Sequence, residues 1–284
     1  MVQARAKEET REDKYLNDQL RELVATSCRI IAQHRLAKGS TGHVSVRIPG
    51  SDDIWVRGRP NVDKGLRFAE PSSIIRVSTR DGMPVGQTRG VSRVSEVYIH
   101  TEIMKARPDV NCVIHGHPPA CVLCSVNNVP LRPIANDARG IAEQGVDFYP
   151  RAITLQAVEE VLPMIEMMGQ KNAIILSQHG MVVTGRSVEE ATNRAISLEV
   201  LARMNWTATL HGGGIREYLE EDIEELERRQ RTAAEAAAQG RDRVEELHPG
   251  GIPGEPRNTG VWPYLVALLE SGELYIDEIG GLGL

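Results

Sequence analysis

The chain alternates between two spacings of hydrophobic residues. Between residues 16 and 38, apolar side chains such as Leu16, Leu20 and Leu23 recur three, four or seven positions apart, which predicts a helix packed by one face. From residue 42 to 77 the pattern changes to short apolar runs, "HVSVRI", "DIWVRG" and "SIIRVS", separated by proline-containing breaks. These runs predict three strands joined by turns.

Helical and extended patterns follow one another through the middle of the chain. Residues 92 to 107 return to helical spacing, and Pro108 ends that helix. The run "DVNCVIH" predicts a buried strand, and a proline pair after it opens another helix. "NAIILSQHGMVVTG" predicts two strands about a His-Gly pair, and Ser187 with Glu190 forms a capping box for a helix that runs to about Leu210. The glycine fingerprint of a dinucleotide-binding fold does not occur among these elements.

The two ends of the chain differ from this middle part. Residues 1–14 are polar and charged without an apolar period, so we expect a flexible arm, followed by one catalytic domain over residues 15–213. Residues 214–284 read as a helical extension and tail, with a charged, alanine-rich helix, a turn-rich linker over residues 248–260 and a short apolar helix. We expect this extension to lie on the surface or at a contact between subunits.

Composition and charge narrow the class of protein. The 284 residues are 41% hydrophobic and 25% charged, which is typical of a globular protein. A net charge of -6 provides no basic surface for nucleic acid, so we expect a small-molecule partner instead. No apolar stretch reaches the ~20 residues that span a bilayer, and the first residues lack the apolar centre of a secretion signal. We therefore expect a cytoplasmic protein without a membrane partner.

The four cysteines have no disulfide-rich spacing. Cys121 and Cys124 form a CxxC motif, which can be redox-active or can bind a metal. Because no second such pair occurs, we interpret both as small core residues on one helix.

Two histidines at the end of the predicted buried strand are the first candidates for chemistry. His115 and His117 are two residues apart, so they project from the same face of the strand and lie close enough to share one cation. A structural pair bonded to backbone carbonyls is equally compatible with this spacing alone. His179 stands beside Gly180 between two apolar strands and supplies a possible third imidazole.

An acidic residue and a fourth histidine precede that strand. Glu96 lies on the predicted helix before it, and His100 is one turn further along the same face. Taken alone, Glu96 would be a solvated carboxylate and His100 an ordinary helix histidine.

Four sequence blocks give a specific resemblance to a known family. "STGHVSVR", "SEVYIH", "VIHGHPPA" and "LSQHGMVVTGRSVEEA" occur in the order and spacing of the class II aldolase and adducin head family, and the resemblance covers roughly residues 17 to 212. It implies an α/β fold, a three-layer α/β/α sandwich with a mainly antiparallel central sheet, assembled as a homotetramer. It also implies that His115, His117 and His179 hold one divalent metal ion per subunit, with Glu96 as base or metal ligand.

The chemistry of such a site supports a carbon-carbon lyase. Breaking a carbon-carbon bond beside a carbonyl or enol leaves negative charge that must move onto oxygen. A cation held by three neutral imidazoles keeps its positive charge and can stabilise this enolate, while Glu96 moves the proton. Three imidazoles with water suit zinc, manganese, iron or cobalt.

Departures from the aldolases point to a different substrate. The sugar-phosphate aldolases hold phosphate with a Gly-Asn, a Ser-Gly and a Ser-Ser at places where this chain has Gly42-His43, Gly58-Arg59 and Val94-Ser95. Most of the small donors are gone, and a guanidinium matches a carboxylate with two parallel hydrogen bonds. We therefore expect a small carboxylate substrate, bound by His43, Arg59 and Ser95. Each of the neighbouring Arg57, Arg89 and Arg93 could instead be an ordinary surface charge. For Arg57 and Arg93 we favour that interpretation.

Three functions remain possible from the sequence. "GHVSVRIPG" followed by "VRGRP" resembles the decarboxylating branch of the family, which acts on hydroxypyridine dicarboxylates and dihydroxyphthalate, so we favour a decarboxylase of a hydroxylated, possibly aromatic, or oxo carboxylic acid. The second is an aldolase or retro-aldolase on a 2-oxo or hydroxy acid, in which Glu96, His100 or Tyr149 accepts the hydroxyl proton. The third is a non-catalytic, adducin-like interaction module. Because the family's sites lie near subunit boundaries, Tyr149 is also a candidate for closing the pocket.

Overall fold

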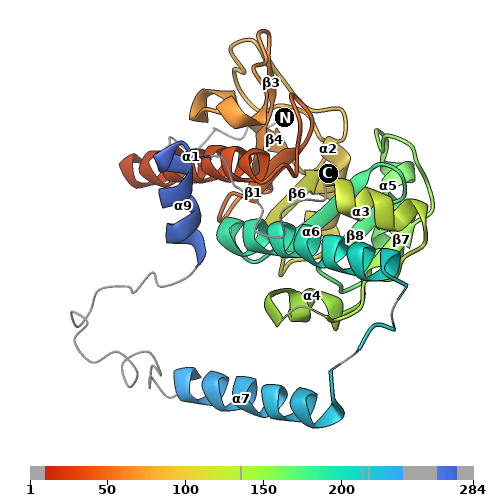
Figure 1. The fold of residues 1–284 in the computed structure, drawn as a ribbon. Helices are drawn as coiled ribbons and strands as arrows, with labels where there is room; N and C mark the ends of the chain where they lie inside the picture. The colour runs from red at the N-terminus through yellow and green to blue at the C-terminus, as the bar shows by residue number, and fades with distance from the viewer. Residues whose placement is uncertain (1–9, 135, 213, 217, 239–260, 274–284) are drawn as a thin grey trace.

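The computed structural model describes residues 10–134, 136–212, 214–216, 218–238 and 261–273. Within these residues the chain forms a mixed seven-stranded sheet between two layers of helices (Figure 1). This arrangement confirms the predicted three-layer α/β/α sandwich.

The central sheet is antiparallel except at one edge. Its strand order is β4-β2-β1-β6-β9-β8-β7, and only the β7 and β8 pair is parallel. A separate two-stranded sheet pairs β3 with β5. The strands are β1 (His43–Arg47), β2 (Asp53–Arg57), β3 (Arg59–Pro60), β4 (Ile74–Ser78), β5 (Val91–Ser92), β6 (Cys112–Gly116), β7 (Asp147–Tyr149), β8 (Ala173–Leu176) and β9 (Gly180–Gly185).

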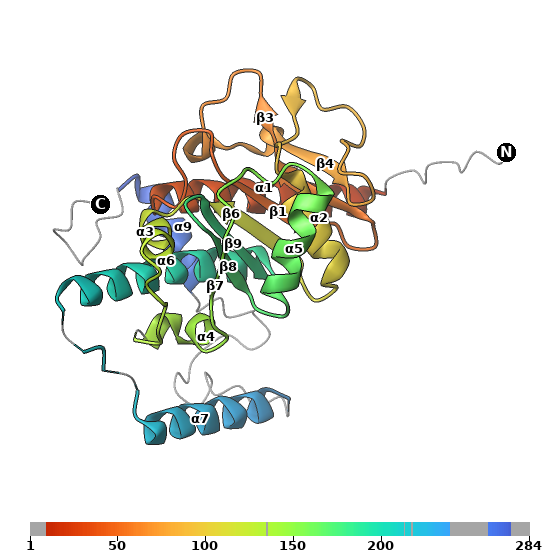
Figure 2. The same cartoon turned by 90° about the vertical axis from the view of Figure 1, so that its right-hand side faces the viewer.

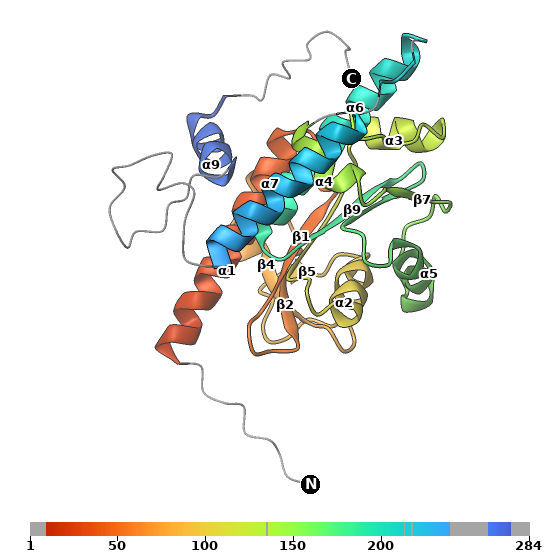
Figure 3. The same cartoon turned by 90° about the horizontal axis from the view of Figure 1, so that it is seen from below.

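The long helices cover the two faces of the sheet. One face carries α1 (Arg11–Gln33), α3 (Pro119–Val126) and α6 (Val188–Leu210), and the other carries α2 (Val97–Ala106) and α5 (Val158–Met168) (Figures 2 and 3). Helix α9 (Val261–Ser271) packs against α1, whereas α7 (Glu220–Ala238) stands apart from the sandwich in Figures 1 and 2. The shorter helical turns are η1 (Leu66–Phe68), η2 (Pro71–Ser73), η3 (Asn136–Ala138) and α4 (Arg139–Ala142). Among the described residues no helix is both long and apolar enough to cross a membrane.

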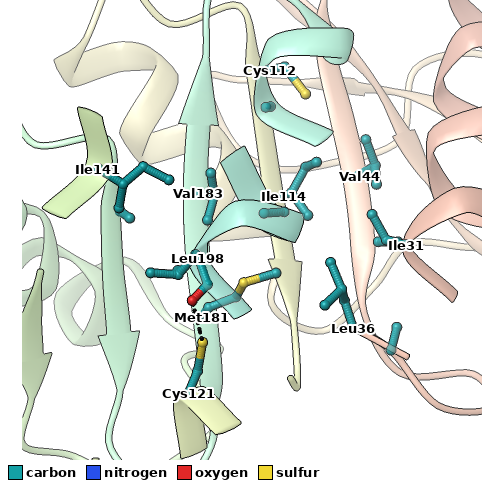
Figure 4. Packing of buried hydrophobic residues seen from close by; sticks show 14 of the residues in the cluster. Ile31, Leu36, Val44, Cys112, Ile114, Cys121, Ile141, Met181, Val183 and Leu198 are labelled. Carbon is teal, nitrogen blue, oxygen red and sulfur yellow. Dashed lines mark hydrogen bonds between the residues drawn. The ribbon is translucent and has the colours of Figure 1, made fainter. Parts of the chain in front are cut away.

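The alternation of side chains along each strand divides the core into two clusters. Val44, Ile114 and Val183 point toward α1 and α6, where they meet Ile31 and Leu198 (Figure 4). The next residue on each central strand points the other way, toward α2 and α5. Polar side chains on that second face, at the ends of the strands, therefore lie between the sheet and α2.

Helix boundaries follow the capping residues. Helix α1 begins at Arg11, inside the stretch expected as an arm, because Thr10 and Asp13 form a capping box. Helix α6 begins after Ser187 as predicted, and the Ser187 hydroxyl accepts a hydrogen bond from the Glu190 N–H. The Glu190 carboxylate accepts from the N–H of Arg186 rather than from that of Ser187.

Several elements differ from the sequence prediction. The segment predicted as one helix over residues 92–107 begins as strand β5 and becomes helical only from Val97, because Val91 and Ser92 pair with β3. Helix α5 and strand β7 were not predicted from the sequence. The linker predicted over residues 248–260 lies outside the described residues.

The interpretation of the CxxC motif is confirmed. Cys121 and Cys124 are buried on α3, and their thiols face the backbone carbonyls of Leu198 and Ala202 on α6. Figure 4 shows the first of these contacts, from Cys121 to Leu198.

Candidate metal centre

Two neighbouring strands bring a first pair of histidines together. His43 opens β1 and is the register partner of His115 in β6, and their ring centroids are 4.9 Å apart. Both side chains project from the sheet face that α2 covers, since they alternate with Val44 and Ile114, which lie in the opposite core cluster. His43 and His115 are almost completely buried, so any ligand they share is shielded from water.

The end of β6 positions His117 beside His115. The two Nε2 atoms are 3.0 Å apart, as the spacing of two residues predicts. The backbone N–H of His117 donates to the carbonyl of Leu36, just beyond α1, at 2.7 Å. A Cβ on the intervening Gly116 would lie 2.6 Å from the same Leu36 oxygen, so only glycine allows this approach.

The turn between β8 and β9 supplies the third imidazole. The His179 ring centroid lies 5.0 Å from those of His115 and His117. Gly180 lets the turn approach β6, because a Cβ there would be 2.2 Å from the Gly116 carbonyl oxygen and 2.6 Å from Cδ2 of His117. The structure thus brings the three predicted ligands together from distant parts of the chain.

Backbone carbonyls determine which ring nitrogens face the centre. Nδ1 of His115 lies 2.9 Å from the carbonyl oxygen of Met181, and Nδ1 of His179 lies 3.1 Å from that of Ile153. A carbonyl can only accept, so both Nδ1 atoms carry the proton and both Nε2 atoms present a lone pair. This is the arrangement by which metal-binding histidines are usually held.

Glu96 occupies the middle of the histidine cluster. It is the residue before α2, and its Oε2 lies 3.5 Å from Nε2 of His115 and 3.6 Å from Nε2 of His43. Its Oε1 lies 3.6 Å from Nε2 of His179 and is buried without a hydrogen-bond partner among the described residues. Carboxylate oxygens that face imidazole lone pairs without a proton between them need a positive charge. The donor set therefore fits a divalent cation, held by three imidazoles with Glu96 adjacent.

Burial favours the neutral form of three of these histidines, His43, His115 and His117. It lowers the pKa of His43 to about 3 and that of His115 well below its usual value, with the neighbouring positive groups adding to the shift for His43. The pKa of His117 is lowered in the same direction, again mainly by burial. Neutral imidazoles are the form that binds a metal ion.

The remaining predicted site residues have different positions. His100 is buried on α2 behind His43, with its Nε2 2.6 Å from Nδ1 of His43. Arg59 and Ser95 are exposed, Arg59 on strand β3 and Ser95 one residue before Glu96. Tyr149 is buried in the core cluster facing α2 and α5, and no hydrogen bond of the described residues joins it to the histidines.

Two of the neighbouring arginines make defined contacts within the chain. Arg57 is buried and pairs with Asp63, so the surface position favoured from the sequence is wrong for it. Its guanidinium also donates to the Ser40 carbonyl, which ties the end of β2 to the loop before β1. Arg93 lies over the ring of Tyr98.

Sequence reasoning missed the groups that support the ligands. Ser45 lies beside His100, and its position two residues after His43 was the available signal. The carbonyl groups of Leu36, Ile153 and Met181 left no signal, because every residue type carries the same backbone oxygen.

Comparisons with known proteins show which family and which relatives this chain resembles. Residues 22–206 match the family described as "Class II Aldolase and Adducin N-terminal domain". A 3,4-dihydroxyphthalate decarboxylase from Arthrobacter keyseri is 36% identical over 213 residues, which are 72% of this chain and 85% of that protein. An alpha-adducin from Rattus norvegicus is 28% identical over 197 residues, 66% of this chain but 26% of the adducin. The solved L-fuculose 1-phosphate aldolase from Glaciozyma antarctica PI12 has a TM-score of 0.64 and 23% identity, covering 77% of this chain and 83% of that one.

Proposed function

The chain belongs to the class II aldolase and adducin N-terminal domain family, and we propose that it is a divalent-metal-dependent decarboxylase of a small hydroxylated aromatic carboxylic acid. Its likeness to a 3,4-dihydroxyphthalate decarboxylase supports a lyase of the decarboxylase type. The observation that carries the proposal is the buried carboxylate of Glu96 among imidazoles of His43, His115 and His179, all within the residues that match the family.

The proposed metal ligands are His115, His117 and His179, with Glu96 beside them. When bound, a divalent ion would supply positive charge to stabilise the negative charge that develops on substrate oxygen. Zinc, manganese, iron and cobalt all suit this donor set.

Residues of the chain account for the other requirements of decarboxylation. When the bond to the carboxylate breaks, carbon dioxide leaves, the electron pair stays on the substrate, and one proton must replace the lost group. Glu96 is the proposed proton carrier, because its carboxyl group faces the centre and is sheltered from solvent. The exposed Arg59 and Ser95 are the proposed contacts for substrate carboxylate at the entrance.

Two alternatives have weaker support. The L-fuculose 1-phosphate aldolase has a similar fold at 23% sequence identity. An aldolase reaction in this chain would need Glu96, His100 or Tyr149 to accept the proton of a substrate hydroxyl. His100 is hydrogen-bonded to the far nitrogen of His43, and no hydrogen bond of the described residues joins Tyr149 to the histidines, so neither is as well placed as Glu96. An interaction module like adducin has no need of a buried carboxylate surrounded by imidazoles. We propose a homotetramer, as in the family, with the pocket near a subunit boundary.

A substrate panel tests the proposal directly. The purified protein, loaded separately with zinc and manganese, is incubated with hydroxylated aromatic dicarboxylates, including 3,4-dihydroxyphthalate, and with 2-oxo acids. Carbon dioxide and aldehyde are assayed in parallel. We expect carbon dioxide from the hydroxylated aromatic acids, whereas aldehyde from the oxo acids would support the aldolase alternative.

Matched variants test the ligand assignment. His117→Ala should lose bound metal and turnover, while His211→Ala, which changes an exposed histidine at the end of α6, should keep both. A fully metallated and active His117→Ala variant would contradict the assignment.

A further inference from the structure

A row of three buried polar side chains runs behind Glu96. Ser45 Oγ lies 2.6 Å from Nδ1 of His100, and Nε2 of His100 lies 2.6 Å from Nδ1 of His43. All three residues are buried, with exposed fractions of 2% or less. The other nitrogen of His43, Nε2, faces Oε2 of Glu96 at 3.6 Å. The row therefore leads from β1 through α2 into the candidate metal centre.

The Val113 carbonyl determines where the protons of this row lie. Ser45 Oγ donates a hydrogen bond to that carbonyl at 3.5 Å, so the single hydroxyl proton points away from His100. The same Oγ therefore accepts the hydrogen bond that joins it to Nδ1 of His100 at 2.6 Å. Nδ1 of His100 thus carries the proton, and its Nε2 presents a lone pair.

The proton on His43 follows from this assignment. Two ring nitrogens 2.6 Å apart must share one hydrogen bond, so Nδ1 of His43 donates to Nε2 of His100. Burial keeps the His43 ring neutral, so its Nε2 then has no proton. A lone pair beside the carboxylate of Glu96 cannot bind a second carboxylate, but it can accept a hydrogen bond from a hydroxyl group.

We infer that Nε2 of His43 accepts a hydrogen bond from a hydroxyl group of the substrate, and that His100 and Ser45 are positioning residues that hold His43 in this tautomer. The inference rests on the proposed function and narrows its substrate to carboxylic acids with a hydroxyl near the reacting carbon. It gives His43 a role other than the carboxylate contact expected from the sequence. The carboxylate contacts then fall to Arg59 and Ser95.

The tautomer can be measured without turnover. Protonated and unprotonated ring nitrogens differ strongly in ¹⁵N chemical shift, so the zinc-loaded protein labelled with ¹⁵N-histidine reports both states. Single substitutions assign the His43 and His100 signals. We expect His43 protonated at Nδ1 alone. Protonation at Nε2, an imidazolium, or coordination of zinc by His43 Nε2 would overturn the inference.

A pair of ligands tests the hydroxyl contact in the same sample. Addition of 3,4-dihydroxyphthalate should shift the His43 Nε2 signal, whereas its 3-O-methyl ether, which has no hydroxyl proton at that position, should not. Equal shifts, or no shift with either compound at millimolar concentration, would overturn the inference. If the shift occurs but no carbon dioxide is released, the proposed function fails while the inference about His43 stands.

Variants connect the tautomer to specificity. Wild-type protein should prefer the hydroxylated substrate over its methyl ether by about tenfold in kcat/KM, the effect of one buried hydrogen bond. The preference should disappear in His43→Ala and in His100→Leu, which removes the acceptor for Nδ1. His100→Gln, whose amide oxygen can accept that hydrogen bond, should restore it. A preference that survives in folded His43→Ala would contradict the contact.

Discussion

Gly180 offers a test of how the candidate centre is assembled without replacing any proposed ligand. A Cβ at this position would lie 2.2 Å from the carbonyl oxygen of Gly116 and 2.6 Å from Cδ2 of His117. Ordinary contacts begin near ~3.4 Å, so Gly180→Ala must push β9 from β6 by about 1 Å or turn the His117 ring. Overpacking of this kind costs ~1–3 kcal/mol. For a domain of this size the unfolding temperature should fall by roughly 2–12 °C.

The assay combines thermal unfolding with metal content. Circular dichroism gives the unfolding temperature, and mass spectrometry of the dialysed protein gives the metal bound per chain. We expect Gly180→Ala to lose most of its metal, because His117 and His179 lie on the two segments that are forced apart. Gly140→Ala is the control, since a Cβ there meets nothing within 4 Å. If Gly180→Ala unfolds with wild-type behaviour and keeps its metal, the close approach of these strands does not hold the centre.

Three further predictions concern the rest of the molecule. Glu199→Leu should lower the free energy of unfolding by ~1–3 kcal/mol, measured by urea titration. The reason is that the buried Glu199 carboxylate accepts hydrogen bonds from the N–H groups of Ala120 and Cys121, at 3.0 and 3.1 Å. The control variant Glu199→Gln should be destabilised less. The four cysteines are all buried, and burial raises the pKa of each thiol, to about 12 for Cys28 and Cys124. A thiol reagent at pH 8 should therefore label them only after unfolding, and rapid labelling of the native protein would contradict this. Removing metal with a chelator should lower the unfolding free energy, by ~2.7 kcal/mol relative to metal at 100 times its Kd, and an unchanged unfolding temperature would argue against a native-state metal site.

Much of the fold was predictable because its signals are local. The strands with "HVSVR" and "CVIHG" and the helix capped by Ser187 follow from side-chain periodicity and capping chemistry. Strand β5 was missed because its extended shape depends on pairing with β3, in which Arg59 is the register partner of Ser92. Such pairing has no local pattern to reveal it.

The candidate site was predictable in its residues but less so in its protonation. Motif order identified His115, His117, His179 and Glu96, and the structure places them within one cluster. The roles of His43 and His100 depend on Ser45 and on the Val113 carbonyl, which are brought near only by the pairing of β1 with β6. A residue type alone does not say which of its nitrogens carries a proton.

The pairing of β6 between β1 and β9 has a consequence for biosynthesis. The segment bearing His179 leaves the ribosome last among those that build the cluster, on the order of ten seconds after the segment bearing His43 at ~5–20 residues per second. Until then the nascent chain presents an incomplete set of donors. In the proposed metal centre, binding by the complete donor set is therefore a late event in synthesis, after the strands that bear His43 and His115 have been made.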